Sequence, residues 1–125
     1  MKNLTRGILF VIIALALGLG PGLQAAGDTF AAIAYSPKTG RYGYGNGYST
    51  KSQAIARAKR ECRSGDARTN WCKNAWIALA ISDGSRGGWG SSWGATADVA
   101  RDSARAECLS RNPDARVVVC VSSNR

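Results

Sequence analysis

The feature that most constrains the fold of this chain is an internal repeat at a shift of forty-six residues. FAAIAYS at residues 30–36 falls on WIALAIS at residues 76–82, and Glu61 and Cys62 fall on Glu107 and Cys108. Matches at this density over most of a chain indicate a duplicated unit. Two copies are too few for a solenoid, so we expect one domain with pseudo-twofold symmetry. The predicted copies span about residues 30–75 and 76–123.

Each copy has the sequence pattern of a β-β-α-β unit. It opens with an apolar run that is typical of a short strand buried on both faces. Turn residues follow, and then a glycine-rich aromatic stretch that we expect to form the return strand. The two stretches, YGNGY and WGSSW, match at a shift of forty-five, which implies one inserted residue. A helix and a last, cysteine-containing strand complete the unit, with helices expected at 52–62 and 97–109 and last strands around 71–72 and at 116–122.

The two predicted helices share a face made of small residues, because alanine and cysteine recur at intervals of four in both. This spacing puts them on one side of an α-helix, which lets the helix lie close to a sheet. Thr50, with Gln53 three residues later, is placed to cap the first helix. Asp98 puts a negative charge near the start of the second helix. The sequence therefore predicts an α+β fold in which two helices pack on an antiparallel sheet.

The first twenty-six residues have the pattern of a cleaved secretory signal peptide. Lys2 and Arg6 supply a short positive region, residues 8–19 form an apolar run, and residues 23–26 offer small side chains for cleavage. The apolar run is shorter than the roughly twenty residues that a spanning helix needs. We therefore expect a secreted or periplasmic protein in which residues 27–125 form a single domain without a transmembrane helix.

The four cysteines are expected to staple this small exported domain, since disulfides persist outside the cytoplasm. Each copy has one cysteine at its helix end and one in the strand that follows. Four cysteines allow three pairings, and we expect the local one. The chain has no histidine and no two close CxxC pairs, so its pattern does not indicate a zinc site. The predicted disulfides are Cys62–Cys72 and Cys108–Cys120.

Residues 27–125 are strongly basic, with fifteen Lys and Arg against eight Asp and Glu, or +7. Nucleic acid is scarce outside the cell, so an exported chain of this charge favours an acidic protein, an anionic envelope polymer or a lipid surface as partner. The same charge would also keep a glycine-rich domain soluble without any specific partner. Oligomeric state does not follow from these observations.

The aromatic stretches are the candidate binding surface. Side chains alternate along a strand, so Tyr44 and Tyr48 would share one face, as would Trp89 and Trp93. Such rows, close to basic residues, would stack on sugar rings or hold an extended polymer. A purely structural role is the alternative, because aromatic rings cover the backbone of neighbouring glycines. The candidate surface comprises Tyr42, Tyr44, Tyr48, Trp89, Trp93, Arg41 and Arg86.

Catalysis is the function class that the sequence supports least. Without histidine there is no Ser-His or Cys-His nucleophile, and GYGNG lacks the ending of a phosphate-binding loop. Glu61 and Glu107 would suit a glycosidase pair only if they met across the pseudo-twofold axis. They are more simply read as helix-surface residues or partners of arginines. We expect no catalytic residue, no metal and no cofactor.

The motifs together resemble the DUF 4189 family of small exported bacterial domains. The resemblance rests on AAIAYS, the glycine-rich aromatic stretch, a helix of spaced alanines ending in cysteine, and an ALA-type strand. It covers nearly all of residues 27–125 and implies an exported, disulfide-stapled domain without a transferable catalytic residue. The family pattern often places a cysteine just before the ALA-type strand, whereas this chain has Trp76 there and Cys72 four residues earlier.

These observations predict a non-catalytic binding protein, inhibitor-like or immunity-like towards an acidic protein. The alternative is a basic effector that acts on an anionic envelope polymer or a membrane surface. A hydrolase is a third, weaker alternative.

Overall fold

The computed structural model describes residues 27–83, 88–109 and 114–124, so the predicted signal peptide and Arg86 lie outside the described residues. The order β-β-α-β occurs twice, as predicted, and both helices begin within one residue of their predicted starts. We call residues 27–75 the first unit and residues 76–124 the second unit. The elements are β1 (Phe30–Tyr35), β2 (Tyr42–Tyr48), α2 (Lys51–Cys62), β3 (Arg68–Lys73), β4 (Trp76–Ser82), β5 (Gly88–Gly94), α3 (Ala97–Leu109) and β6 (Arg116–Ser122).

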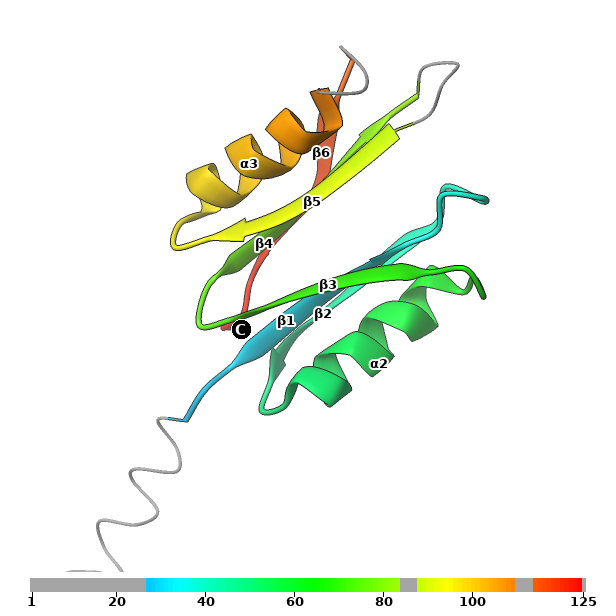
Figure 1. Cartoon of the computed structure of the whole chain (residues 1–125). Coiled ribbons are helices and arrows are strands. Elements are labelled where there is room, and N and C mark those ends of the chain that lie inside the picture. Colours follow the sequence, from blue (N-terminus) through cyan, green and yellow to red (C-terminus); the bar gives the residue numbers. More distant parts are fainter. Residues whose placement is uncertain (1–26, 84–87, 110–113, 125) are drawn as a thin grey trace, which may run out of the picture.

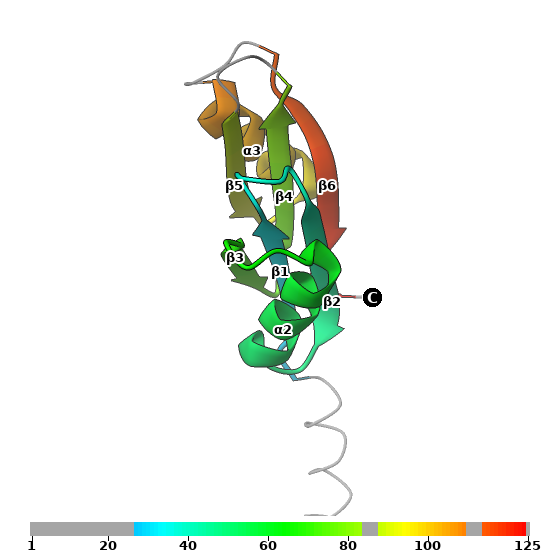
Figure 2. The same cartoon turned by 90° about the vertical axis from the view of Figure 1, so that its right-hand side faces the viewer.

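The strands form two three-stranded antiparallel sheets, ordered β2-β1-β3 and β5-β4-β6, instead of one sheet. The sheets pack face to face, and α2 and α3 cover their outer faces, which gives four layers (Figure 1). β1 contacts β4, β2 contacts β6 and β3 contacts β5. Figure 2 accordingly shows β3 and β5 along one edge of the sandwich and β2 and β6 along the other. The central strands β1 and β4 are buried on both faces because each lies between a helix and the opposite sheet.

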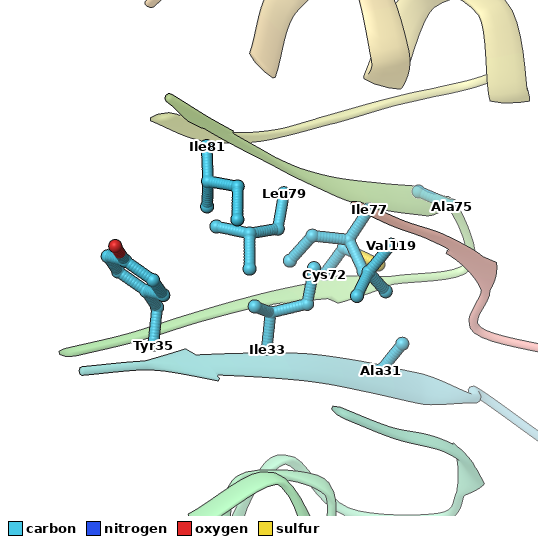
Figure 3. Packing of buried hydrophobic residues seen from close by; sticks show 9 residues of the cluster. All are labelled: Ala31, Ile33, Tyr35, Cys72, Ala75, Ile77, Leu79, Ile81 and Val119. Atoms are coloured by element: carbon cyan, nitrogen blue, oxygen red, sulfur yellow. The ribbon is translucent and has the colours of Figure 1, made fainter. Parts of the chain in front are cut away.

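The core between the sheets is built from the larger apolar side chains of the central strands. Ile33 of β1 faces Ile77 and Leu79 of β4 (Figure 3), and these are the largest fully buried side chains. Trp89 packs against Tyr35 at one end of this core, with ring centroids 5.4 Å apart. Alternate residues of the same strands point outwards to the helices, as a side-chain period of two requires.

The outer faces of the sheets contact their helices through small residues, as the alanine spacing predicts. Alanines of β1 meet Ala54, Ala58 and Cys62 of α2, and the second unit repeats this arrangement. The helix backbone lies so close that a Cβ added at Gly43 would be 2.6 Å from the carbonyl oxygen of Ala58. At Gly90 the added Cβ would be 2.5 Å from the corresponding oxygen in α3. Both positions therefore need glycine because the helix crosses directly over the strand.

Both helices begin at threonine caps. The Thr50 Oγ1 accepts a hydrogen bond from the amide of Gln53 at 3.2 Å, and the Thr96 Oγ1 accepts one from the amide of Val99 at 3.2 Å. These contacts satisfy backbone donors that the first helical turn leaves without partners. The predicted start of the first helix is thus confirmed by its cap.

The predicted disulfide between Cys62 and Cys72 is wrong, because the two side chains lie on opposite faces of one sheet. Cys62 packs beneath α2, whereas Cys72 belongs to the core between the two sheets. The helix end and the following strand are close in sequence, but the side-chain alternation of β3 turns Cys72 away from α2. No disulfide forms between them.

The predicted disulfide between Cys108 and Cys120 is also wrong, and here distance is the reason. The Sγ of Cys120 lies 3.7 Å from the carbonyl oxygen of Ala97, at the start of α3. Cys108 lies at the other end of that helix, about 16 Å away at 1.5 Å per residue. A disulfide requires Cα atoms within about 7 Å of each other. Burial raises the pKa of the thiols of Cys62, Cys72 and Cys120, so these cysteines act as small neutral core residues.

The strand register also corrects the predicted match between YGNGY and WGSSW. Gly43 lies opposite Ala34, and Gly90 lies opposite Ala80, the counterpart of Ala34 in the second unit. The two strands therefore correspond at a shift of forty-seven at this point and not forty-five. The repeated element is the glycine beneath the helix, and the aromatic positions around it are only partly equivalent.

Candidate binding site

The two predicted aromatic rows do not form one platform. They lie on β2 and β5, which are edge strands on opposite sides of the sandwich (Figure 2). Trp89 is partly buried and packs against the core between the sheets. Trp93 is 59% exposed on the β5 edge. The candidate surface thus divides into two separate edges.

A β-bulge divides the predicted row of tyrosines on β2. The pairing with β1 shifts between Phe30 and Ala32, and Gly47 adopts a positive φ of 75°. Tyr42 and Tyr44 therefore lie on the face away from α2, whereas Tyr48 packs against the small-residue cluster beneath the helix. The expected alternation fails because an extra residue reverses the direction of the side chains that follow it.

An open groove of about 450 Å³ runs along the outer edge of β2, between this strand and α2. A volume of this size falls within the range of sites that hold small molecules or short segments. Two of the candidate tyrosines contribute most of its exposed aromatic surface, since Tyr42 is 40% exposed and Tyr44 is 45% exposed. The lining residues are Tyr42, Gly43, Tyr44, Gly45, Asn46, Tyr48, Arg57 and Glu61.

Arg57 and Glu61 of α2 form the charged wall of the groove. Their side chains make an ion pair at 3.0 Å, and each is about half exposed. They overhang the strand because Gly43 and Gly45 have no side chains to hold the helix away. The strand register and the helix spacing together produce a wall of one cation and one anion opposite a wall of tyrosine rings.

Arg41 lies outside this groove, at the far end of α2. Its Nη1 donates a hydrogen bond to the carbonyl oxygen of Arg63 at 3.5 Å, and its own carbonyl oxygen accepts one from the Cys62 Sγ at 3.4 Å. Arg63 is the helix C-cap and has a left-handed φ of 57°. A cation at this end is favourable because the last carbonyl groups of a helix carry partial negative charge.

The charge of the chain is concentrated in the first unit. Residues 27–75 contain nine Lys and Arg against three Asp and Glu, or +6, whereas residues 76–125 contain six against five, or +1. All described Lys and Arg residues of the second unit form ion pairs with carboxylates. Counting charge by halves would have revealed this division in the sequence. The described cations outside the ion pairs are Lys38, Arg41, Lys51, Lys59, Arg60, Arg63 and Arg68.

Trp71 is an exposed aromatic residue that the sequence reasoning missed. Its ring lies 6.2 Å from that of Phe30, and the Lys51 ammonium sits 4.6 Å from its centroid. It is 39% exposed beside the start of α2. The sequence identified it only as part of a strand, because no glycine-rich stretch surrounds it.

Ser36, which follows β1, and Ser82, the last residue of β4, each donate a side-chain hydrogen bond to a carboxylate. The Ser36 Oγ donates to Asp66 at 2.6 Å, and Ser82 makes the corresponding bond to Asp114. The bond from Ser36 is the main reason why the pKa of Asp66 lies below its ordinary value. Ser36 also accepts from the amide of Thr39 at 3.1 Å, as expected for a residue that organises a turn.

Glu61 and Glu107 do not meet, because α2 and α3 lie on opposite outer faces of the sandwich (Figure 1). Across the described ranges, no group of three His, Cys, Asp or Glu residues is arranged to hold a metal ion. No helix within those ranges combines the length and apolar character needed to cross a membrane.

The chain thus forms a four-layer α/β/β/α sandwich with a groove at one sheet edge. A family model with the description "Domain of unknown function (DUF4189)" matches residues 30–121. The protein belongs to the DUF4189 family, as its motifs predicted. The comparisons with curated proteins and with solved structures find no match.

Proposed function

We propose that this protein is an exported, non-catalytic binding protein whose first unit docks on an acidic partner protein. The observation that carries the proposal is the distribution of charge. Every described Lys or Arg outside an ion pair belongs to the first unit. Positive charge concentrated on one side of a molecule produces an electrostatic field that orients an oppositely charged partner during encounter. Solubility alone does not require the charge to be concentrated on one side.

A protein partner suits the groove better than a uniformly anionic polymer does. Glu61 lines the groove together with Arg57, so the groove presents one cation and one anion and not the continuous row of cations that suits a uniformly anionic polymer. A protein surface offers acidic, neutral and aromatic groups in one defined pattern. Tyr42 and Tyr44 supply the rigid aromatic contacts that are enriched in protein interfaces.

The alternative, an effector that acts on an anionic envelope polymer or a membrane surface, would depend on the positive charge of the first unit alone. Lys59, Arg60 and Arg63 lie at the C-terminal end of α2 and are exposed. A contact made by such side chains alone would be weak and strongly sensitive to salt. An inhibitor-like complex would instead keep a fixed ratio of the two proteins as salt rises.

Export belongs to the proposal because the leader pattern lies in residues 1–26. The proposal also includes the origin of the domain by pseudo-twofold duplication of one unit. It is supported by the repeated order of elements, by the repeated strand order, and by the contacts of β2 with β6 and of β3 with β5, which exchange when the two units are swapped.

The test is capture by residues 27–125 from envelope extract and from culture medium, with two charge-reversed variants for comparison. Lys59→Glu with Arg60→Glu changes the first unit, and Arg101→Glu with Arg105→Glu makes the same change of charge in the second. We expect one acidic protein to be retained in fixed ratio at low and moderate salt, with loss only for the first variant. Equal loss for both variants, or retention of glycan or lipid that disappears as salt rises, would refute the protein-docking function.

A further inference from the structure

We propose that the outer edge of β2 binds an extended acidic segment of the partner as an additional β-strand. This inference rests on the proposed function, because it specifies how the acidic partner is held. Binding by strand addition requires three features in one place: outward-pointing backbone groups, space beside them, and side walls that match the segment. β2 supplies all three over residues 42–45.

The second unit shows which backbone amides point outwards. Ser91 of β5 lies opposite Leu79, and its amide donates to the Glu107 Oε2 at 3.1 Å, away from β4. Tyr44 occupies the same position in β2, because it lies opposite Ile33, the counterpart of Leu79. The amide of Tyr44 is therefore directed to the outer edge of its sheet. In an antiparallel strand every second residue shares this direction, so the amide of Tyr42 is directed outwards as well.

One substitution between the two units explains why β5 is closed and β2 is open. Glu61 is the counterpart of Glu107, but its carboxylate is held by Arg57 at 3.0 Å. The residue of α3 that corresponds to Arg57 is Ser103, which carries no charge, and the Glu107 carboxylate accepts from the Ser91 amide. The second unit thus covers its own edge amide with its glutamate. In the first unit Arg57 draws the equivalent carboxylate into an ion pair along the helix.

The walls of the groove define the chemistry of the segment. Side chains of an added strand would point alternately towards the two faces of the sheet. One set would lie against Tyr42 and Tyr44, and the other would lie against α2, beside Arg57. The first unit carries +6, so acidic side chains are favoured on the helix side. We infer a segment in which acidic residues alternate with β-branched or aromatic residues.

The open edge of β2 is short, because the residues that follow the start of the bulge bond to the other sheet. The amide of Gly47 donates to the carbonyl oxygen of Ser123 at 2.9 Å, and the Asn46 Nδ2 donates to that of Ser122 at 3.2 Å. These bonds join the end of β2 to the C-terminal strand of the other sheet. A partner segment therefore pairs with about four residues, and its side chains must supply much of the specificity.

The test uses two peptides of equal charge and a pair of matched variants. Acetyl-(Thr-Glu)5-amide can pair as a strand, whereas the same peptide N-methylated at every residue has no backbone N–H groups left to donate to a ladder. We expect only the first to slow hydrogen exchange at the amide of Tyr44 in NMR titrations of residues 27–125. Arg57→Ser should release Glu61 to cover that amide and weaken binding about tenfold or more, which is 1.4 kcal/mol or more. Arg60→Ser removes the same charge outside the groove and should weaken binding less than about threefold.

Each other result contradicts the inference in an identifiable way. Equal binding of both peptides, with Arg57→Ser and Arg60→Ser equally weakened, would exclude strand addition and leave a charge-driven docking function intact. No binding of either peptide at low salt would overturn the proposed function together with the inference. Protection of the Tyr44 amide that grows with protein concentration, without peptide, would identify a second copy of this chain as the occupant.

Discussion

Replacing Gly43 with alanine tests the close contact between helix and strand on which the groove depends. The added methyl carbon would lie 2.6 Å from both the carbonyl oxygen of Ala58 and the amide nitrogen of Cys62, and close to the Cβ of Glu61. Two of these neighbours are backbone atoms, which have no rotamer to change. The helix must therefore retreat by about 0.8 Å to restore ordinary contact distances at this point.

The cost follows from two opposing effects. Overpacking of a close contact costs about 1–3 kcal/mol, and a backbone obstacle places this case in the upper part of that range. Alanine also restricts the unfolded chain, which returns about 0.4–1 kcal/mol. We expect Gly43→Ala to lower the free energy of unfolding by about 1–2 kcal/mol. For a domain of this size the melting temperature should fall by about 5–15 °C.

The assay is urea denaturation of Gly43→Ala beside two matched variants. Gly90→Ala should cost a similar amount, because its added Cβ meets the same atoms of α3. Gly65→Ala has no atom within 4 Å of the added carbon and should be neutral or slightly stabilising. If Gly43→Ala proved as stable as Gly65→Ala, the helix would not lie against the strand as described, and the wall formed by α2 would lose its basis.

Three further predictions concern the cap, the acid range and the thiols. Thr50→Ala should lower the free energy of unfolding by about 1 kcal/mol in urea titrations, because the amide of Gln53 loses its acceptor. The lowered pKa of Asp66 adds stability that is complete above its ordinary value of 3.8 and is lost as pH falls through the lowered value in the folded state. Asp66→Asn should therefore flatten the acid side of a plot of urea midpoint against pH, and an unchanged slope would contradict the role given to Ser36. Since the cysteines form no disulfide, a reductant should leave the melting temperature unchanged. If a disulfide were present, its reduction would lower the free energy of unfolding by about 2–4 kcal/mol and the melting temperature would fall.

The elements that the sequence predicted well are those with local signals. Alanine and cysteine at intervals of four define the buried face of a helix without reference to the rest of the chain. The apolar runs FAAIAY and WIALAI predict strands buried on both faces, and β1 and β4 are the central strands of their sheets. These patterns predict the elements and their order, because the physical cause of each lies within about twelve residues.

The predictions that failed depended on which face a side chain occupies. The Cys62–Cys72 pairing assumed that a helix end and the next strand present their cysteines to the same layer. The tyrosine row assumed an uninterrupted strand, whereas the bulge between Gly45 and Tyr48 reverses the direction. Nothing in the local sequence shows that the strands divide into two facing sheets. That division arises from packing between residues some forty-five positions apart.

A comparison of equivalent positions shows which residues of the two units maintain the common scaffold and which make the units different. Positions that are alike in both units serve the shared scaffold, such as the threonine caps, the buried alanines and the glycines beneath the helices. Positions that differ between the units account for the differences in their strand edges and in their charge. Arg57 stands where the second unit has Ser103, and Arg60 stands where it has Ala106. Arg57 leaves the strand edge of the first unit open and Arg60 adds one of its cations outside ion pairs, while Glu107 closes the equivalent edge of the second unit. A fold of two such units with one closed and one open edge would have a single docking site and one preferred orientation for its partner.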